Sequence, residues 1–113
     1  MKLADKKISF KEVEELAKNK FGNLVKAVVD VERELMVVDG ELHSDEEALL
    51  LSKGSKQENL WGINLYPELK GENFVEFDSM INVRPSYGNN SRGVDDANLK
   101  RKIVQIVEKL VQR

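Results

Sequence analysis

The stretch LWGINLYPELKGENFVEFDSMINVR, residues 60–84, decides the fold. Apolar residues alternate with polar or small ones on both sides of a loop at residues 67–73, and this period of two is typical of a β-hairpin. If Tyr66 pairs with Phe74, counting outward along both strands from this pair gives the register. The pairs expected on one face are Leu65 with Val75, Ile63 with Phe77 and Trp61 with Ser79, and those on the other are Asn64 with Glu76 and Gly62 with Asp78. The stretch therefore predicts one apolar and one polar face, with Trp61 and Phe77 in the core.

The segments before the hairpin supply two more strands and two helices. Ser9 and Glu12 have the spacing of a capping box, which predicts a helix that begins near residue 10 and ends at Gly22. Residues 24–32 are rich in valine and predict a strand, and residues 35–38 predict a second strand that enters a tight turn at 39–40. Ser44 and Glu47 repeat the capping-box spacing, so we expect a short helix of about two turns that starts there.

The C-terminal part predicts a loop and a long helix. Residues 85–94 are rich in glycine, asparagine and serine, as in a loop. Asp95 or Asp96 then caps a helix with a broad apolar stripe suited to packing on a sheet. Together these elements predict a single α+β domain over residues 1–113. We expect a mainly antiparallel sheet of about four strands, with an N-terminal helix, a short middle helix and a C-terminal helix packed on one face.

Composition excludes several classes of protein. The chain has 113 residues and no cysteine, so disulfide scaffolds and cysteine-ligated metal or iron–sulfur sites are excluded. Its apolar runs are far shorter than the roughly 18 residues of a membrane span, and no secretory signal is evident, so we expect a cytoplasmic protein that contacts no membrane. Lys and Arg number 18 against 20 Asp and Glu, and this balance makes nucleic-acid binding unfavourable.

The polar face of the hairpin is the best candidate for a functional surface. Carboxylates, amides and a guanidinium on it lie beside apolar residues, as in a ligand cleft or a partner interface, although a solvated sheet face produces the same pattern. We expect this face to bind a protein partner or a small ligand, and we expect the protein to form a homo-oligomer. No motif for a cofactor is present, and we expect none. The candidate binding residues are Asn64, Glu76, Asp78, Asn82, Arg84 and Arg92.

An alternative interpretation is a small hydrolase or metal-assisted enzyme. Asp30, Glu41, His43 and Asp78 would be its acids, bases or ligands, provided that the sheet brought them together. Because His43 is the only histidine, zinc sites with several imidazoles are excluded unless the chain forms an oligomer. We expect no metal site. Glu41, His43 and Glu46 could contribute to an oxygen-rich one, but acidic residues in a first helical turn are expected from the helix dipole alone.

Five segments of the sequence are distinctive: KAVVDVE at 26–32, GELH at 40–43, LWGINLYP at 60–67, FDSMINVRP at 77–85 and SRGV at 91–94. In these segments the chain resembles a small prokaryotic family of conserved proteins with no assigned function. The resemblance covers roughly residues 9–112 and implies no substrate, cofactor or active residue.

Overall fold

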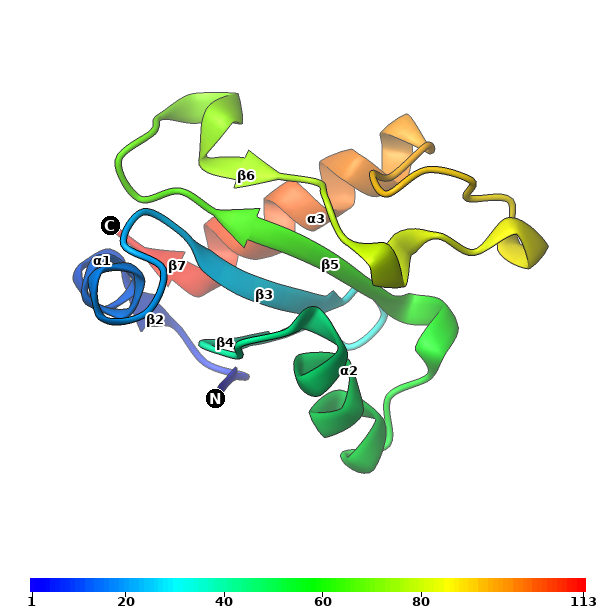
Figure 1. Ribbon diagram of the computed structural model, residues 1–113, viewed down its shortest axis with the longest axis horizontal. Helices are drawn as coiled ribbons and strands as arrows, with labels where there is room; N and C mark the ends of the chain where they lie inside the picture. Colours follow the sequence, from blue (N-terminus) through cyan, green and yellow to red (C-terminus); the bar gives the residue numbers. More distant parts are fainter.

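Three α-helices and a five-stranded antiparallel sheet make up the fold (Figure 1). The computed structural model describes residues 1–113. Its strands are β1 (Lys2–Ala4), β2 (Ile8–Ser9), β3 (Val25–Asp30), β4 (Leu35–Val38), β5 (Leu60–Leu65), β6 (Val75–Glu76) and β7 (Val111–Gln112). Its α-helices are α1 (Phe10–Asn19), α2 (His43–Ser52) and α3 (Ala97–Leu110), and four short 3₁₀ helices are η1 (Gln57–Asn59), η2 (Gly71–Phe74), η3 (Met80–Asn82) and η4 (Pro85–Tyr87).

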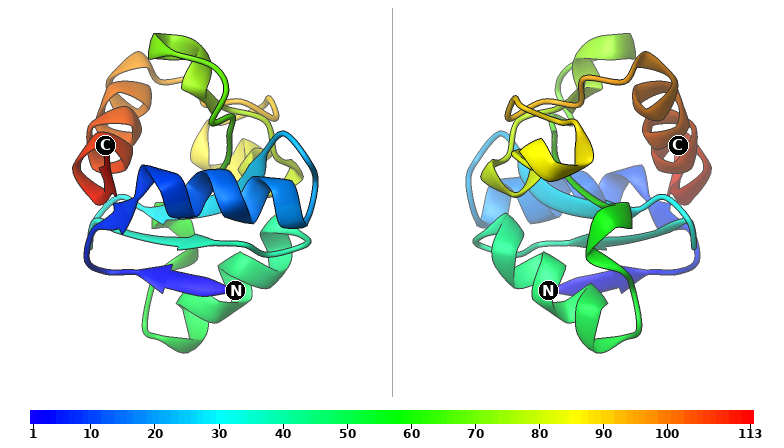
Figure 2. Two further views of the ribbon diagram at one scale, coloured as in Figure 1. Left: turned by 90° about the vertical axis from the view of Figure 1, so that its left-hand side faces the viewer. Right: turned by 90° about the vertical axis from the view of Figure 1, so that its right-hand side faces the viewer.

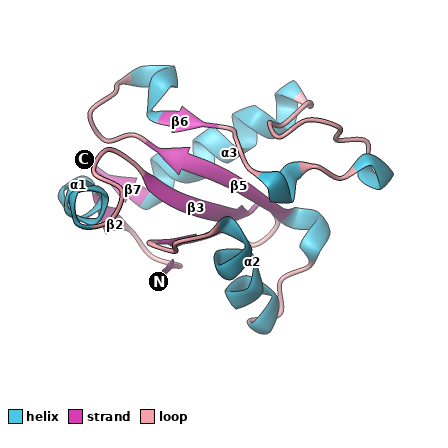
Figure 3. Cartoon of the chain, in the orientation of Figure 1, coloured by secondary structure: helices cyan, strands magenta, loops and turns pink.

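The sheet confirms the predicted α+β class and the antiparallel pairing. Its strand order is β1-β4-β3-β5-β6, and β2 and β7 form a separate parallel pair that joins the two ends of the chain (Figure 3). The strands that the sequence did not predict, β1, β2 and β7, have two or three residues each. Such short segments are too brief to show an alternating pattern.

The helices cover both faces of the sheet, and not one face as predicted. In Figure 2, α1 and α3 lie on one side of the strands and α2 on the other. The larger core lies under α1 and α3 and contains Trp61 and Ile63, whereas α2 covers a smaller cluster formed by Val28, Val37, Leu50 and Leu60. Val28, Val37 and Leu60 make the second face of the sheet partly apolar. That face is therefore also covered by a helix.

The helix ends agree with the predicted caps at two of three places. Ser9 Oγ accepts a hydrogen bond from Glu12 N at 3.1 Å, and the Asp96 carboxylate caps α3. At α2 the prediction of Ser44 as the cap is wrong, because the backbone N–H of Asp45 donates to the Leu42 carbonyl and the helix already begins at His43. None of the three helices combines the length and apolar character needed to cross a membrane.

The hairpin follows the predicted register only at its closed end. Tyr66 N donates to Phe74 O at 2.9 Å, and Leu65 pairs with Val75. The prediction that residues 77–84 continue the strand is wrong, since β6 ends at Glu76 and η3 and η4 follow. Phe77 is therefore only half-buried at the edge of the larger core.

A side chain takes the place of the missing strand. Asn82 is fully buried, and its Oδ1 accepts from Gly62 N at 2.8 Å while its Nδ2 donates to Gly62 O at 2.9 Å. A primary amide carries one donor and one acceptor side by side, as a peptide group does, and so it pairs with a strand edge. Asn89 completes the arrangement because its Nδ2 donates to Asn82 O at 2.7 Å. These two amides attach residues 77–95 to the edge of β5.

We predict that Asn82→Ala lowers the free energy of unfolding by about 3 kcal/mol, because buried groups of Gly62 lose their partners at about 1–3 kcal/mol each. Chemical denaturation measures the change. Asn90→Ala is the matched control: its side chain is exposed and makes no hydrogen bond, so we expect a change below about 0.5 kcal/mol. Equal losses in the two variants would contradict the role given to Asn82.

Candidate functional site

A pocket of about 240 Å³ lies on the α2 side of the sheet, at the place where β6 ends. We call it the His43 pocket. Its polar lining comes from β3, the start of α2, β5 and the segment that follows β6, and consists of Lys26, His43, Ser44, Asn64, Asp78, Ser79 and Arg92. Leu42, Met80 and Ile81 form its apolar side. The pocket thus joins residues that are far apart in the sequence.

His43 enters this pocket as a neutral imidazole. Its side chain is only 8% exposed, and its Nε2 lies 2.8 Å from the Ile63 carbonyl oxygen. A carbonyl only accepts, so Nε2 carries the proton, and burial lowers the pKa of His43 and favours the neutral ring. Nδ1 then holds a lone pair and has no hydrogen-bond partner within the chain.

Gly62 provides the space for this packing. A Cβ at Gly62 would lie 2.5 Å from Ser79 Oγ and 3.2 Å from His43 Cγ. Any side chain there would push Ser79 and the imidazole away from β5. Glycine is required at this position for close approach.

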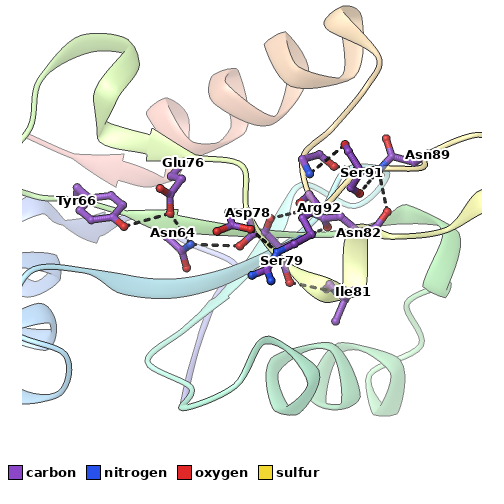
Figure 4. A network of polar contacts seen from close by, with 12 residues as sticks. Asn64, Tyr66, Glu76, Asp78, Ser79, Ile81, Asn82, Asn89, Ser91 and Arg92 are labelled. Atoms are coloured by element: carbon purple, nitrogen blue, oxygen red, sulfur yellow. Dashed lines mark hydrogen bonds and ion pairs between the residues drawn. The ribbon is translucent and has the colours of Figure 1, made fainter.

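Asn64 contributes a hydrogen-bond acceptor with a defined orientation (Figure 4). Its Nδ2 donates to Glu76 Oε1 at 2.9 Å and to the Asp78 carbonyl at 3.2 Å. Both partners only accept, so an amide flip that exchanges Oδ1 and Nδ2 would lose both hydrogen bonds. Oδ1 is buried and has no partner, although the side chain is only 6% exposed. Asn64 therefore presents an unsatisfied acceptor.

Charged side chains complete the pocket. Arg92 Nε donates to Asp78 Oδ1 at 2.6 Å, and both side chains are partly exposed. Lys26 lies opposite Asn64 in the β3–β5 register, with its Nζ 5.5 Å from the centroid of the Phe21 ring. Lys26 makes no ion pair within the chain. The pocket thus contains two cations and one carboxylate.

The other predicted binding residues lie outside the pocket. Glu76 is exposed beside it and accepts from Asn64 and Tyr66. Asn82 is used by the Gly62 backbone, so the prediction that it lies on an open polar face is wrong. Arg84 is also buried, paired with Glu47 at 3.2 Å and stacked 5.0 Å from the Trp61 ring centroid. Both lie inward because the chain leaves the strand geometry after Glu76.

Of the four residues of the alternative enzyme interpretation, only His43 and Asp78 are brought together, in the His43 pocket. Asp30 is buried at the far end of β3, where its carboxylate accepts from Arg33 N and from Ser55 Oγ at 2.6 Å. It is four residues along the strand from Lys26, or about 13 Å at the usual strand rise. Glu41 is exposed and does not line the His43 pocket. His, Asp and Glu residues form no group of three that could hold a metal ion.

Glu46, the third candidate metal ligand, binds the backbone. Its Oε2 accepts from Gly40 N at 3.0 Å, and its Oε1 has no partner. A Cβ at Gly40 would lie 2.5 Å from Glu46 Cγ, so the carboxyl group packs directly on glycine. Burial raises the pKa of Glu46 to about 9, and the group is therefore protonated at neutral pH.

Sequence reasoning missed Lys26 and Ser79 as pocket residues. Lys26 lies among the valines of β3, on the same face of the sheet as Asn64. Its position beside Asn64 can be recognised only once β3 is known to pair with β5. The alternating pattern predicts Ser79 on the apolar face, with Trp61, because it predicts that the second strand of the hairpin continues past Glu76. No residue pattern in the sequence indicates that the strand ends after Glu76.

We predict that Glu46→Gln stabilises the protein at neutral pH and that its advantage grows as pH rises. The folded-state pKa of Glu46 is about 9 against an ordinary value of 4.5. Between these values the unfolded chain releases a proton that the folded chain keeps, so the wild type loses up to about 1.4 kcal/mol per pH unit. Glutamine does not titrate and has almost the same shape.

Urea unfolding at about pH 5 and about pH 8 measures this difference, which should widen with pH for Glu46→Gln. Glu41→Gln, at an exposed position five residues earlier, should show no widening. A gap for Glu46→Gln that is the same at both pH values would contradict the protonated carboxyl group.

Comparison with known proteins agrees with the resemblance noted in the sequence. No curated protein and no solved structure matches the chain. A family model described as "Protein of unknown function (DUF5674)" matches residues 2–110. Because this match spans nearly the whole chain, the protein belongs to the DUF5674 family, whose function is unknown.

Proposed function

We propose that the protein is a binding module whose His43 pocket takes a small polar molecule with both a hydrogen-bond donor and an anionic group. The pocket volume of about 240 Å³ suits a ligand of amino-acid size. It lies just below the roughly 300–1,000 Å³ typical of sites for larger ligands. Polar groups from four separate segments converge on it, as in sites that orient a small molecule.

The observation that carries this proposal is the unsatisfied Oδ1 of Asn64. A buried acceptor without a partner costs about 1–3 kcal/mol. Oδ1 is closed off from solvent, so a ligand N–H or O–H recovers that cost only when the side chains that cover the atom move aside. His43 Nδ1 offers a second lone pair in the same pocket. Two acceptors without partners select a ligand that donates, such as an ammonium or a hydroxyl group.

The cations favour an anionic group on the same molecule. Lys26 is free of ion pairs, and Arg92 pairs with Asp78 through Nε only, which leaves its Nη groups as donors. Guanidinium and ammonium groups bind carboxylates and phosphates through charge-assisted hydrogen bonds. The Asp78 carboxylate can in turn accept from a ligand ammonium. An α-amino acid has this combination of groups.

Binding is better supported than the hydrolase alternative. Of its four residues only His43 and Asp78 line the pocket. Asp30 is saturated by hydrogen bonds elsewhere, and Ser79, the only hydroxyl that packs with His43 on Gly62, is 1% exposed. A buried hydroxyl without a paired base does not meet the requirements of a nucleophile.

A protein partner is the second candidate for the same surface. Leu42 and Met80 are large apolar side chains at the rim of the pocket and are 56% and 65% exposed. Apolar side chains around a polar centre also occur in protein interfaces. In that case Leu42→Ser, which removes an exposed apolar side chain from the rim, would weaken complex formation with the partner.

We predict that free amino acids bind the pocket more tightly than compounds with only one of the two groups. Serine and alanine should shift the backbone NMR signals of residues around Asn64 and Asp78, whereas propionate and ethylamine should shift them much less. Lys26→Met should weaken binding about tenfold, the effect of losing one charge-assisted hydrogen bond.

Lys102→Met on α3 removes the same charge from an exposed position outside the pocket, and it should leave the affinity unchanged. Equal shifts with propionate and serine, or equal affinities for the Lys26→Met variant and the wild type, would overturn the proposal.

A further inference from the structure

A larger hollow lies on the other side of the sheet and is separate from the His43 pocket. It has a volume of about 620 Å³ and runs between α3, the C-terminal residues and η2. We call it the α3 groove. Its volume is within the roughly 300–1,000 Å³ typical of small-molecule sites. The two hollows share no lining residue.

The floor of the α3 groove is apolar. Its side chains come from η2, β6, α3 and β7 and are Phe74, Val75, Val104, Val107 and Val111. Only Val104 is half-exposed, and the others belong to the larger core. The floor is therefore held rigidly, and its contact surface for an alkyl chain is Val104 with the exposed edges of Phe74 and Val75.

The rim of the groove is basic. It contains four cationic side chains, Lys7, Lys70, Lys109 and Arg113, and a single acidic side chain, Glu108. This local excess contrasts with the net charge of −2 of the whole chain. Lys109 also contacts Glu34 at 3.2 Å, through an exposed ion pair that water screens. The other three cations form no ion pair.

Arg113 is positioned to receive an anion at the end of the groove. Its guanidinium lies 4.4 Å from the Phe10 ring centroid and 4.7 Å from that of Phe74, stacked against both. Stacking restrains the guanidinium while leaving its N–H groups free, and none of them forms a hydrogen bond within the chain. A guanidinium held in this way is suited to two parallel hydrogen bonds with a carboxylate or phosphate.

We propose that the α3 groove binds a free single-chain amphiphile with an anionic head group. The head group pairs with Arg113 and the lysines of the rim, and the alkyl chain lies on Phe74 and the valines. A neutral apolar molecule leaves the cations without partners, and a small inorganic anion leaves the floor exposed to water. Only a molecule with both parts satisfies the whole groove.

Titration with decanoate below its micelle-forming concentration tests this inference. Backbone NMR signals of the residues that line the groove should shift in a saturable manner. Acetate lacks the chain and decyltrimethylammonium has the opposite charge, so both should bind at least about tenfold more weakly. Equal binding of decanoate and decyltrimethylammonium would show that charge plays no part and would overturn the proposal.

Substitutions of the cations at the rim test where the head group binds. Arg113→Gln and Lys70→Gln should each weaken decanoate binding, with Arg113→Gln giving the larger effect of about tenfold. Arg101→Gln removes the same charge from an exposed position of α3 outside the groove and should change the affinity less than about twofold. Lys26→Met should also have no effect, since it lies in the His43 pocket.

A last measurement separates a free ligand from a membrane. Vesicles that contain anionic lipid present the same head-group charge on a surface. Binding to such vesicles without any binding of monomeric decanoate would overturn the proposal, as would an unchanged affinity in Arg113→Gln.

Discussion

The paired hydrogen bonds between the Asn82 side chain and the Gly62 backbone hold together the part of the molecule on which the candidate site depends. They satisfy the edge of β5 where β6 has ended, and both partners are buried. Because a side-chain amide replaces a strand, the main chain is free to leave the sheet after Glu76. It then crosses the face of the sheet that α2 covers and brings Asp78, Ser79 and Arg92 to the His43 pocket.

Glycine and burial determine the chemistry of the α2 face. Gly62 and Gly40 have no room for a Cβ, and each receives a titratable side chain of α2, His43 on one and Glu46 on the other. Both are desolvated, which lowers the pKa of His43 and raises that of Glu46, so both favour the neutral form. The charges near the pocket are therefore those of Lys26, Asp78 and Arg92, which remain in contact with solvent.

The α3 groove arises in a different way. There the sheet, α3 and the C-terminal strand form a continuous apolar core, and lysines and an arginine surround the place where that core reaches the surface. The His43 pocket has two cations and one carboxylate, whereas the groove has four cations and one acidic side chain. This difference in local charge, rather than in size, is why the two hollows are expected to take different ligands.

Local patterns in the sequence determined much of the fold. The cap at Ser9, a cap at Asp95 or Asp96, the alternation of residues 60–65 and the register of Leu65 with Val75 depend on near neighbours. The structure confirms them, with Asp96 as the cap of α3. Tertiary structure alone decided that β6 ends after two residues, that α2 covers the second face, and that Asn82 and Arg84 lie inside. The physical reason is that an alternating pattern records only which residues differ in polarity. Whether a polar residue meets water or a buried backbone group depends on partners far along the chain, here Gly62 for Asn82 and Glu47 for Arg84.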